Sequence, residues 1–274
     1  MPSLKKVTIE LDLPEGLLAY KVDLKPGPVK LHHVVRKLLR FCDEVNELGE
    51  GIAAQFGKKI ACGPSCGACC RQMVPLSPPE AAHIAEIVNS LPKDKKKEII
   101  ARFTGARQKL ARSGVLEKMT NLYMCTASDE EILEVNREYF EQNIECPFLE
   151  NGSCSIHRVR PSRCREYSVL TPKELCRDPF DRQIKRLPVT VRLCESITYA
   201  WASLTGNRPR IIPLVDALFQ VDSNPDMAMR TIDKPEPLVR AILEHACDRA
   251  NKRAHMKMKK SSNKLSNSRQ TPGR

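Results

Sequence analysis

The chain has 274 residues, of which 41% are hydrophobic, so it is long enough to bury a core in one or two domains. No window approaches the roughly 20 consecutive apolar residues of a membrane-spanning helix, and the first residues lack the apolar run of a secretory signal. We therefore expect a cytoplasmic protein with no membrane partner, in which disulfides are disfavoured and clustered thiols indicate metal or redox sites.

The formal net charge of +12 is concentrated near the C-terminus. Residues 251–274 contain eight Lys or Arg and no Asp or Glu, which accounts for eight of the twelve net charges. Beyond residue 261 the composition is typical of a disordered tail; such tails are usually solvated extensions, and some contact nucleic acid or acidic partners. Aromatic residues make up 5% of the chain and do not alternate with basic ones, so nucleic-acid binding is not expected, while the basic tail leaves room for a protein partner.

Residues 1–60 are predicted to form a β-hairpin followed by a helix. Polar and apolar side chains alternate over residues 5–12 and again over 19–24, which predicts two short antiparallel strands. From residue 29 to about 56 the apolar side chains repeat with the period of a helix. Cys42 falls within this apolar stripe, so we interpret it as a buried structural thiol.

The rest of the chain is predicted to be largely helical. Ser77 and Ser128 are each followed three residues later by a glutamate, the spacing of a capping box, so a helix should begin after each serine. Further helices are expected over residues 93–119, 189–205, 213–220 and 236–257. The fold class is therefore mainly α, with a cysteine-rich core and a short N-terminal β-hairpin.

The chain is organised around two groups of cysteines. The first group places four thiols within nine residues, with two glycines and a proline between them: Cys62, Cys66, Cys69 and Cys70. Closely spaced thiolates chelate a metal because each further ligand adds little loop entropy once the first is bound. Glycine tolerates the positive φ angles of such loops. This spacing predicts a metal site.

The second group consists of Cys146, Cys154 and Cys164. Asn151-Gly152 lies between the short segments 146–149 and 153–156, and this dipeptide is a strong signal for a two-residue hairpin turn. Such a hairpin would bring Cys146 and Cys154 close together.

The two groups together resemble a family of zinc- or iron-chelating domains that is named for its Cys-x-x-Cys-x-x-Cys-Cys signature. The resemblance covers about residues 60–170 and rests on Cys66-Gly-Ala-Cys69-Cys70-Arg71, the helix start at 74–80, Cys146-Pro-Phe-Leu, Asn151-Gly-Ser-Cys154 and Arg160-Pro-Ser-Arg-Cys164-Arg165. It implies a metal ion or iron-sulfur cluster in a mostly helical protein. The domain also resembles part of a flagellin lysine methylase, which links it to methyl transfer.

Seven thiols match this pattern: Cys62, Cys66, Cys69, Cys70, Cys146, Cys154 and Cys164. A structural zinc ion and an iron-sulfur cluster each take four thiolates, so ligand number leaves zinc and iron open. The surplus thiols, and Arg71, Arg163 and Arg165 beside them, favour an iron-sulfur cluster over zinc. A zinc ion that only holds helices together is the alternative, and a redox-active Cys66-x-x-Cys69 pair is a further one.

No catalytic set is recognisable near the cysteines. Acidic, histidine and tyrosine side chains occur close by in sequence, without the arrangement of an acid-base pair: Glu80, Glu150, His157, Glu166 and Tyr167. We therefore predict a metal-binding protein with four segments, namely a hairpin plus helix (1–60), a cysteine-cluster domain (61–170), a helical region (171–260) and a basic tail (261–274). An enzyme that uses the cluster for protein lysine methyl transfer or electron transfer is the competing interpretation.

Overall fold

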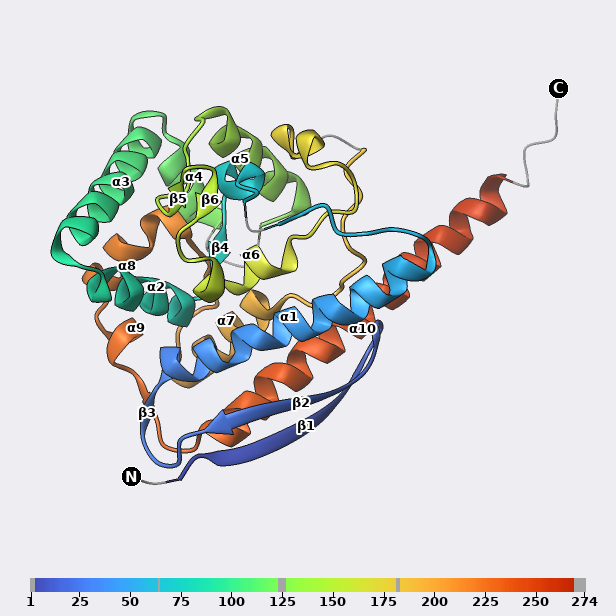
Figure 1. Cartoon of the computed structure of the whole chain (residues 1–274), viewed down its shortest axis with the longest axis horizontal. Coiled ribbons are helices and arrows are strands. Elements are labelled where there is room, and N and C mark those ends of the chain that lie inside the picture. The colour runs from blue at the N-terminus through green and yellow to red at the C-terminus, as the bar shows by residue number, and fades with distance from the viewer. Residues whose placement is uncertain (1–2, 64, 123–126, 181–182, 269–274) are drawn as a thin grey trace.

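The computed structural model describes residues 3–63, 65–122, 127–180 and 183–268. Helices make up 59% of the structure, which confirms a mainly α protein with a short N-terminal β-hairpin. Figure 1 shows most of the helices gathered into one body, with the hairpin along one edge and the end of the longest helix extending outward.

The α-helices are α1 (Leu31–Gln55), α2 (Pro78–Ser90), α3 (Lys93–Arg112), α4 (Val115–Leu122), α5 (Asp129–Glu141), α6 (Ser162–Glu166), α7 (Leu193–Thr205), α8 (Ala217–Ser223), α9 (Asp226–Met229) and α10 (Pro235–Ser268). Short 3-10 helices are η1 (Ala68–Arg71), η2 (His157–Val159), η3 (Lys173–Arg177) and η4 (Leu214–Asp216). The strands form antiparallel pairs: β1 (Lys5–Leu13) with β2 (Gly16–Leu24), β3 (Val29–Lys30) with β8 (Thr231–Ile232), β4 (Pro75–Leu76) with β7 (Ile212–Pro213), and β5 (Leu149–Glu150) with β6 (Ser153–Cys154).

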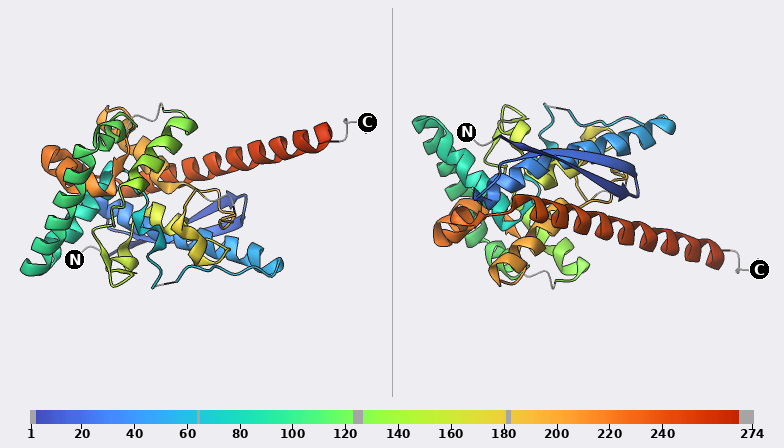
Figure 2. Two further views of the ribbon diagram at one scale, coloured as in Figure 1. Left: turned by 90° about the horizontal axis from the view of Figure 1, so that it is seen from above. Right: turned by 90° about the horizontal axis from the view of Figure 1, so that it is seen from below.

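The β1–β2 hairpin buries one face against α1 and α10. Alternate side chains of both strands point inward and join a core with apolar residues of α1, α7 and α10, as the alternation in the sequence predicts. Figure 2 shows the hairpin beside α1 and α10. At the turn, the Glu15 carboxylate accepts hydrogen bonds from the backbone N–H and the hydroxyl of Thr190, at 2.6 and 2.8 Å. Because the hairpin and α10 bury side chains in the same core, the N-terminal and C-terminal parts of the chain are packed together there.

A second core lies under the cysteine hairpin. It is formed by apolar side chains of α2, α3 and α8 together with Phe148 and Ile156, and the partly buried Cys146 and Cys154 pack against its edge. Both predicted capping boxes are present, with Ser77 and Ser128 each accepting from the backbone N–H three residues later. A third, smaller core joins α3, α4 and α5. Two of the metal-ligand candidates, Cys146 and Cys154, thus rest on packed helices.

The helix predicted over 93–119 is divided in the structure. It ends at Arg112 and resumes as α4 at Val115, because Gly114 adopts a left-handed φ of 75° that a continuous helix does not allow. At the other end of the chain, α10 continues beyond the expected residue 257 to Ser268, through a stretch that contains neither glycine nor proline. Residues 269–274 of the predicted tail lie outside the described residues.

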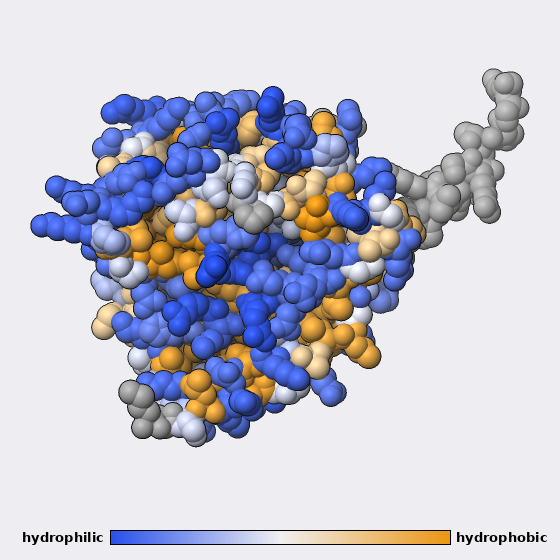
Figure 3. Space-filling view, in the orientation of Figure 1, coloured by the Kyte–Doolittle hydropathy of each residue, from blue (hydrophilic) through white to orange (hydrophobic). Residues whose placement is uncertain are grey.

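The surface is mostly hydrophilic on the face shown in Figure 3, with separate apolar patches between the charged regions. The edge that corresponds to α3 in Figure 1 is strongly hydrophilic, and the lysine-rich start of α3 is largely solvent-exposed. Among the described helices none has a long enough apolar stretch to cross a membrane.

Candidate metal centre

The first cysteine loop connects α1 to α2 and closes on itself through backbone hydrogen bonds. The N–H of Cys66 donates to Gly63 O at 2.9 Å, and the N–H of Cys70 donates to Gly67 O at 3.0 Å, where η1 forms. A Cβ atom on Gly67 would lie 2.5 Å from Leu149 Cδ1 and 2.9 Å from Gly152 O. Glycine is therefore needed here because the first loop lies directly against the β5–β6 hairpin.

The second cysteine loop contains the predicted hairpin. Asn151 and Gly152 have φ angles of 50° and 74°, which is the left-handed pair of a type I′ turn. Leu149 pairs with Cys154 across the turn. The N–H of Cys146 donates to Cys70 O at 2.7 Å, so the backbones of the two loops are joined directly. Two segments separated by four helices therefore meet at their cysteines.

Arg102 and Lys95 of α3 hold the second loop from outside. Arg102 donates to Pro147 O at 3.1 Å and to Leu149 O at 3.2 Å. Lys95 forms an ion pair with Glu150 at 2.8 Å. These contacts keep the hairpin on the surface of the second core.

Glu80 connects the starts of α2 and α6. One carboxylate oxygen accepts from the N–H and hydroxyl of Ser77, at 3.0 and 2.8 Å, and the other accepts from the N–H and hydroxyl of Ser162, at 2.9 and 2.7 Å. Glu80 is only 2% exposed, so these donors replace the water that a carboxylate would otherwise need. Cys164 lies two residues after Ser162, and its position therefore depends on this carboxylate.

Arg165 fixes the other side of α6 to α1. It is 7% exposed, donates to the carbonyl oxygens of Arg158 and Arg160 at 2.6 and 2.9 Å, and pairs with Asp43 of α1. Asn46 of α1 donates to Arg165 O at 2.7 Å. Arg165 is thus used to hold the backbone that carries Cys164.

The seven predicted ligands are all partly buried. The Cys69 thiol raises the pKa of four of the others, namely Cys62, Cys146, Cys154 and Cys164. A hydrogen bond to Cys70 and then burial raise the pKa of Cys69. Burial also raises the pKa of Cys146 and Cys164, and in both cases the Cys69 thiol adds to the increase. Without a metal these thiols are therefore protonated at neutral pH, and metal binding must release their protons.

Backbone N–H groups of other residues donate to the sulfur atoms of Cys62, Cys146 and Cys154. The N–H of Phe148 donates to Cys146 and the N–H of Ile156 donates to Cys154, each from two residues downstream. The N–H of Val169 donates to Cys62 Sγ at 3.4 Å. Such donors favour the thiolate, which is the form that binds metals.

Cys176 is a thiol that the motif pattern does not include. It lies in η3, which packs on η1, and it is only 3% exposed. Burial raises the pKa of Cys176 to about 11, with contributions from Cys62, Cys66 and Cys69. Cys176 therefore lies beside the first loop and joins the seven predicted ligands as an eighth thiol. Its position soon after Cys164 was the only sequence signal for its place in this group.

The arginine that faces the thiols is Arg160. Its positive charge lowers the pKa of Cys62, Cys69, Cys154 and Cys164, opposing the effect of burial. Its buried Nε has no hydrogen-bond partner among the described residues.

The three arginines singled out from the sequence pair with carboxylates instead. Arg71 lies 2.8 Å from Glu145, Arg163 lies 3.4 Å from Glu166, and Arg165 pairs with Asp43.

Three other described cysteines are buried and lie on helices rather than in the loops. Cys42 lies in the core beneath the hairpin, as its place in the apolar stripe predicts, and Cys247 of α10 lies in the same core. Cys194 of α7 has its sulfur 3.6 Å from Pro75 O. Cys125 lies outside the described residues.

A cavity of about 900 Å³ opens beside Cys69 and Cys164. Its lining among the described residues includes six arginines: Arg137, Arg163, Arg186, Arg192, Arg249 and Arg253. The acidic residues of the lining are Asp129, Glu166 and Glu195. The cavity wall therefore carries an excess of positive charge next to two of the candidate ligands.

Residues 61–186 match the model of the CxxCxxCC family, described as "Putative zinc- or iron-chelating domain". The match confirms the resemblance drawn from the two cysteine groups, and it extends far enough to include Cys176. Searches of curated proteins and of solved structures found no match. The segment that carries the cysteines thus matches a family described as zinc- or iron-chelating, which supports metal binding by this segment.

Proposed function

We propose that the protein is an iron-sulfur protein whose two cysteine loops together hold at least one cluster. The observation that carries this proposal is the direct contact of the loops, where the N–H of Cys146 donates to Cys70 O. Neither loop alone offers the surroundings of Cys69, whose thiol has neighbours from both. A bound cluster would supply one-electron transfer.

The spacing of the sulfur atoms supports a cluster over a single zinc ion. With Zn–S bonds of about 2.3 Å, a tetrahedral zinc site holds its sulfur atoms about 3.8 Å apart. Among the described cysteines, no three sulfur atoms lie within 4.8 Å of one another. A cluster places its own iron and sulfide between the thiolates and so suits more widely spaced ligands.

The number of thiols supports the same proposal. Adding Cys176 to the seven predicted ligands gives eight thiols, which is enough for two centres of four ligands each. The backbone N–H donors and Arg160 suit the negative charge of such a cluster.

The sample to analyse is anaerobically purified full-length protein, in which absorption, iron, zinc and acid-labile sulfide are measured together. We expect broad charge-transfer absorption near 400 nm, about where thiolate-ligated iron-sulfur absorbs, and sulfide equal to iron. A colourless protein with stoichiometric zinc would replace this proposal with a structural zinc site.

A cluster-dependent enzyme is the second candidate, and the cavity beside Cys69 and Cys164 favours it. Because arginines outnumber acids in the described lining, the cavity suits an anionic molecule better than a sulfonium or a lysine side chain. Between the two reactions considered, electron transfer to an anionic acceptor is therefore favoured over methyl transfer. Equilibrium dialysis with S-adenosylmethionine tests this preference, since specific binding of S-adenosylmethionine would favour methyl transfer over electron transfer.

We place the protein in the cytoplasm, where the reducing environment would keep the thiols available for metal. We assign the basic C-terminal end to contact with an acidic protein surface rather than nucleic acid. Co-purification of the full chain with and without residues 261–274 would test this assignment.

A further inference from the structure

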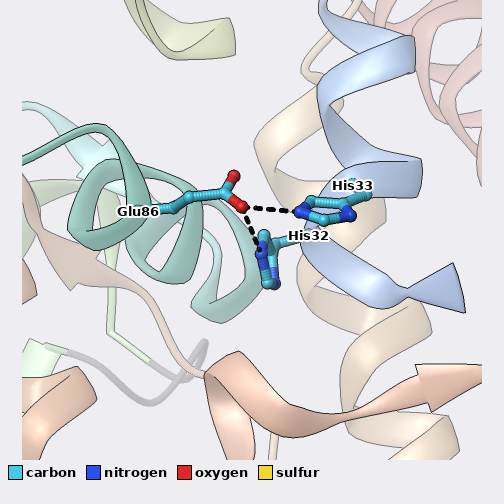
Figure 4. Close-up of side chains that lie close together, drawn as sticks. All are labelled: His32, His33 and Glu86. Atoms are coloured by element: carbon cyan, nitrogen blue, oxygen red, sulfur yellow. Dashed lines mark hydrogen bonds and ion pairs between the residues drawn. The ribbon is translucent and has the colours of Figure 1, made fainter. Parts of the chain in front are cut away.

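A second group of metal-ligand side chains lies outside the cysteine loops, where the start of α1 meets α2. His33 Nε2 is 2.6 Å from Glu86 Oε1, and His32 Nε2 is 3.6 Å from the same oxygen. Figure 4 shows both imidazole rings approaching the carboxylate from α1 while Glu86 reaches across from α2. Within the described part of the chain, this is the one group of three potential ligand atoms that all lie within 4.8 Å of one another.

The buried histidines of this group are not satisfied by hydrogen bonds. His32 is 2% exposed and its Nδ1 has no partner among the described residues. His83 of α2 is 4% exposed, and neither of its ring nitrogens has a hydrogen-bond partner among the described residues; Nδ1 lies 3.6 Å from Glu86 Oε2, beyond hydrogen-bond distance. Buried polar atoms are nearly always paired, so several unpaired imidazole nitrogens around one carboxylate require an explanation.

Burial keeps both of these imidazoles neutral. It lowers the pKa of His32, and it lowers the pKa of His83 to about 4. A neutral imidazole has a free lone pair, and it is the form that binds metals. An ion pair with Glu86 therefore does not explain why His32 and His83 are buried beside this carboxylate.

The donor types select a class of metal. Imidazole nitrogen suits zinc and the later first-row transition metals, whereas calcium and magnesium require oxygen ligands. Lys30 and Arg36 add positive charge close to His32 and His83, which disfavours a cation held by charge alone. The side chains of His33 and Glu86 are 38% and 39% exposed, so an ion can enter from solvent.

We propose that His32, His33 and Glu86 form a second metal site, which binds a divalent transition metal such as zinc. His83 lies on the other side of the carboxylate, with its Nδ1 3.6 Å from Glu86 Oε2, and helps to position it. Metal bonds of about 2.0–2.2 Å separate neighbouring ligand atoms by about 3.3 Å. The His33–Glu86 distance of 2.6 Å would widen and the His32–Glu86 distance of 3.6 Å would narrow, which a small rotation of Glu86 achieves. The site shares no ligand with the cysteine loops and stands whatever those loops hold.

The probe is Co²⁺, added to full-length protein as purified. Cobalt bound by nitrogen and oxygen gives visible ligand-field bands without the sulfur-to-metal charge transfer that thiolates give. We expect one equivalent of Co²⁺ to bind with the nitrogen and oxygen signature. His33→Gln and Glu86→Gln should each weaken this binding at least about tenfold, since even supporting groups of metal sites contribute about 10- to 100-fold.

The matched control is His255→Gln, because His255 is an exposed histidine of α10 whose ring nitrogen Nδ1 lies 3.1 Å from Asn251 O of the same helix. It should leave Co²⁺ binding unchanged. Both test residues are half-exposed, so their variants should fold, and circular dichroism checks this. Cobalt spectra that show only charge transfer, no bound cobalt, or equal affinity in wild type and both variants would overturn the proposal.

Discussion

The β1–β2 hairpin and the cysteine loops are both built without long helices, yet different forces hold them in place. The hairpin has regular strand pairing and buries a continuous row of apolar side chains against α1 and α10. The cysteine loops bury few apolar groups of their own and are held by single polar contacts, such as Cys146 N–H to Cys70 O and the Glu80 carboxylate. Burial stabilises the first region, and precise polar contacts position the second.

This difference separates stability from metal binding. A thiol cluster needs its ligands at set positions, so irregular backbone fixed by hydrogen bonds serves it better than a flat apolar face. The metal in turn stabilises the loops because the ligands come from both of them. Changes in the hairpin should therefore reduce stability alone, whereas changes in the polar contacts should also reduce metal retention.

Ile9→Ala should give the largest loss of stability. Ile9 is 2% exposed at the centre of the hairpin face, and removing such a side chain costs about 2–5 kcal/mol. Denaturant unfolding measures the loss. Metal content per folded molecule should stay at the wild-type value; a fall would mean that the two regions are coupled. Leu17→Ala is the control, since Leu17 is 81% exposed on the same hairpin.

Glu80→Gln should cost about 1–3 kcal/mol, because an amide NH₂ would face backbone and hydroxyl donors that now bond to a carboxylate oxygen. Metal retention should fall as well, since α6 and Cys164 lose their attachment to α2. Unfolding curves and metal analysis of the same sample give both quantities. Glu131→Gln changes the equivalent residue of the exposed capping box and should affect neither strongly; if it matched Glu80→Gln, the link to Ser162 would be unimportant.

The metal-free protein should lose stability in alkali. Burial raises the folded-state pKa of Cys146 and Cys164 above the ordinary 9.0, so the unfolded chain loses these protons first as the pH rises. The contribution of these protonated thiols to the free energy of unfolding is fully present below pH 9.0. Above pH 9.0 it decreases by up to about 1.4 kcal/mol per thiol and pH unit. Urea midpoints from pH 7 to 10 measure the effect. Metal-loaded protein, whose thiolates have already lost their protons, should not show it.

Deleting residues 261–274 should have the smallest effect. The segment begins within the extended end of α10, away from both regions compared above (Figures 1 and 2). Metal content and the thermal midpoint should stay at the wild-type values. A loss of metal would show that the basic end takes part in the site.

Local signals predicted the regular parts of this protein well. The serine-glutamate pairs at Ser77 and Ser128 marked two helix starts, and Asn151-Gly152 marked the hairpin turn, because each depends on neighbouring residues alone. The place of Cys176 beside the first loop and of Arg160 among the thiols depends on how distant segments pack. No spacing in the sequence carries that information.

The sequence did not indicate that His32, His33 and Glu86 come together, for the same reason. His32 and Glu86 are separated by most of two helices, and only the contact of α1 with α2 brings them together. His83, by itself, is a single histidine within a helix, and nothing in its sequence neighbours indicates a ligand.

The most direct test of the account measures iron, zinc and sulfide per polypeptide in Cys69→Ser and Cys146→Ser, one residue from each loop. The control is Cys247→Ser, which alters a buried thiol in the hairpin core. We predict that both loop variants lose most of their metal and become less stable, while Cys247→Ser retains its metal. Full metal content in either loop variant would show that the two loops do not form a common site.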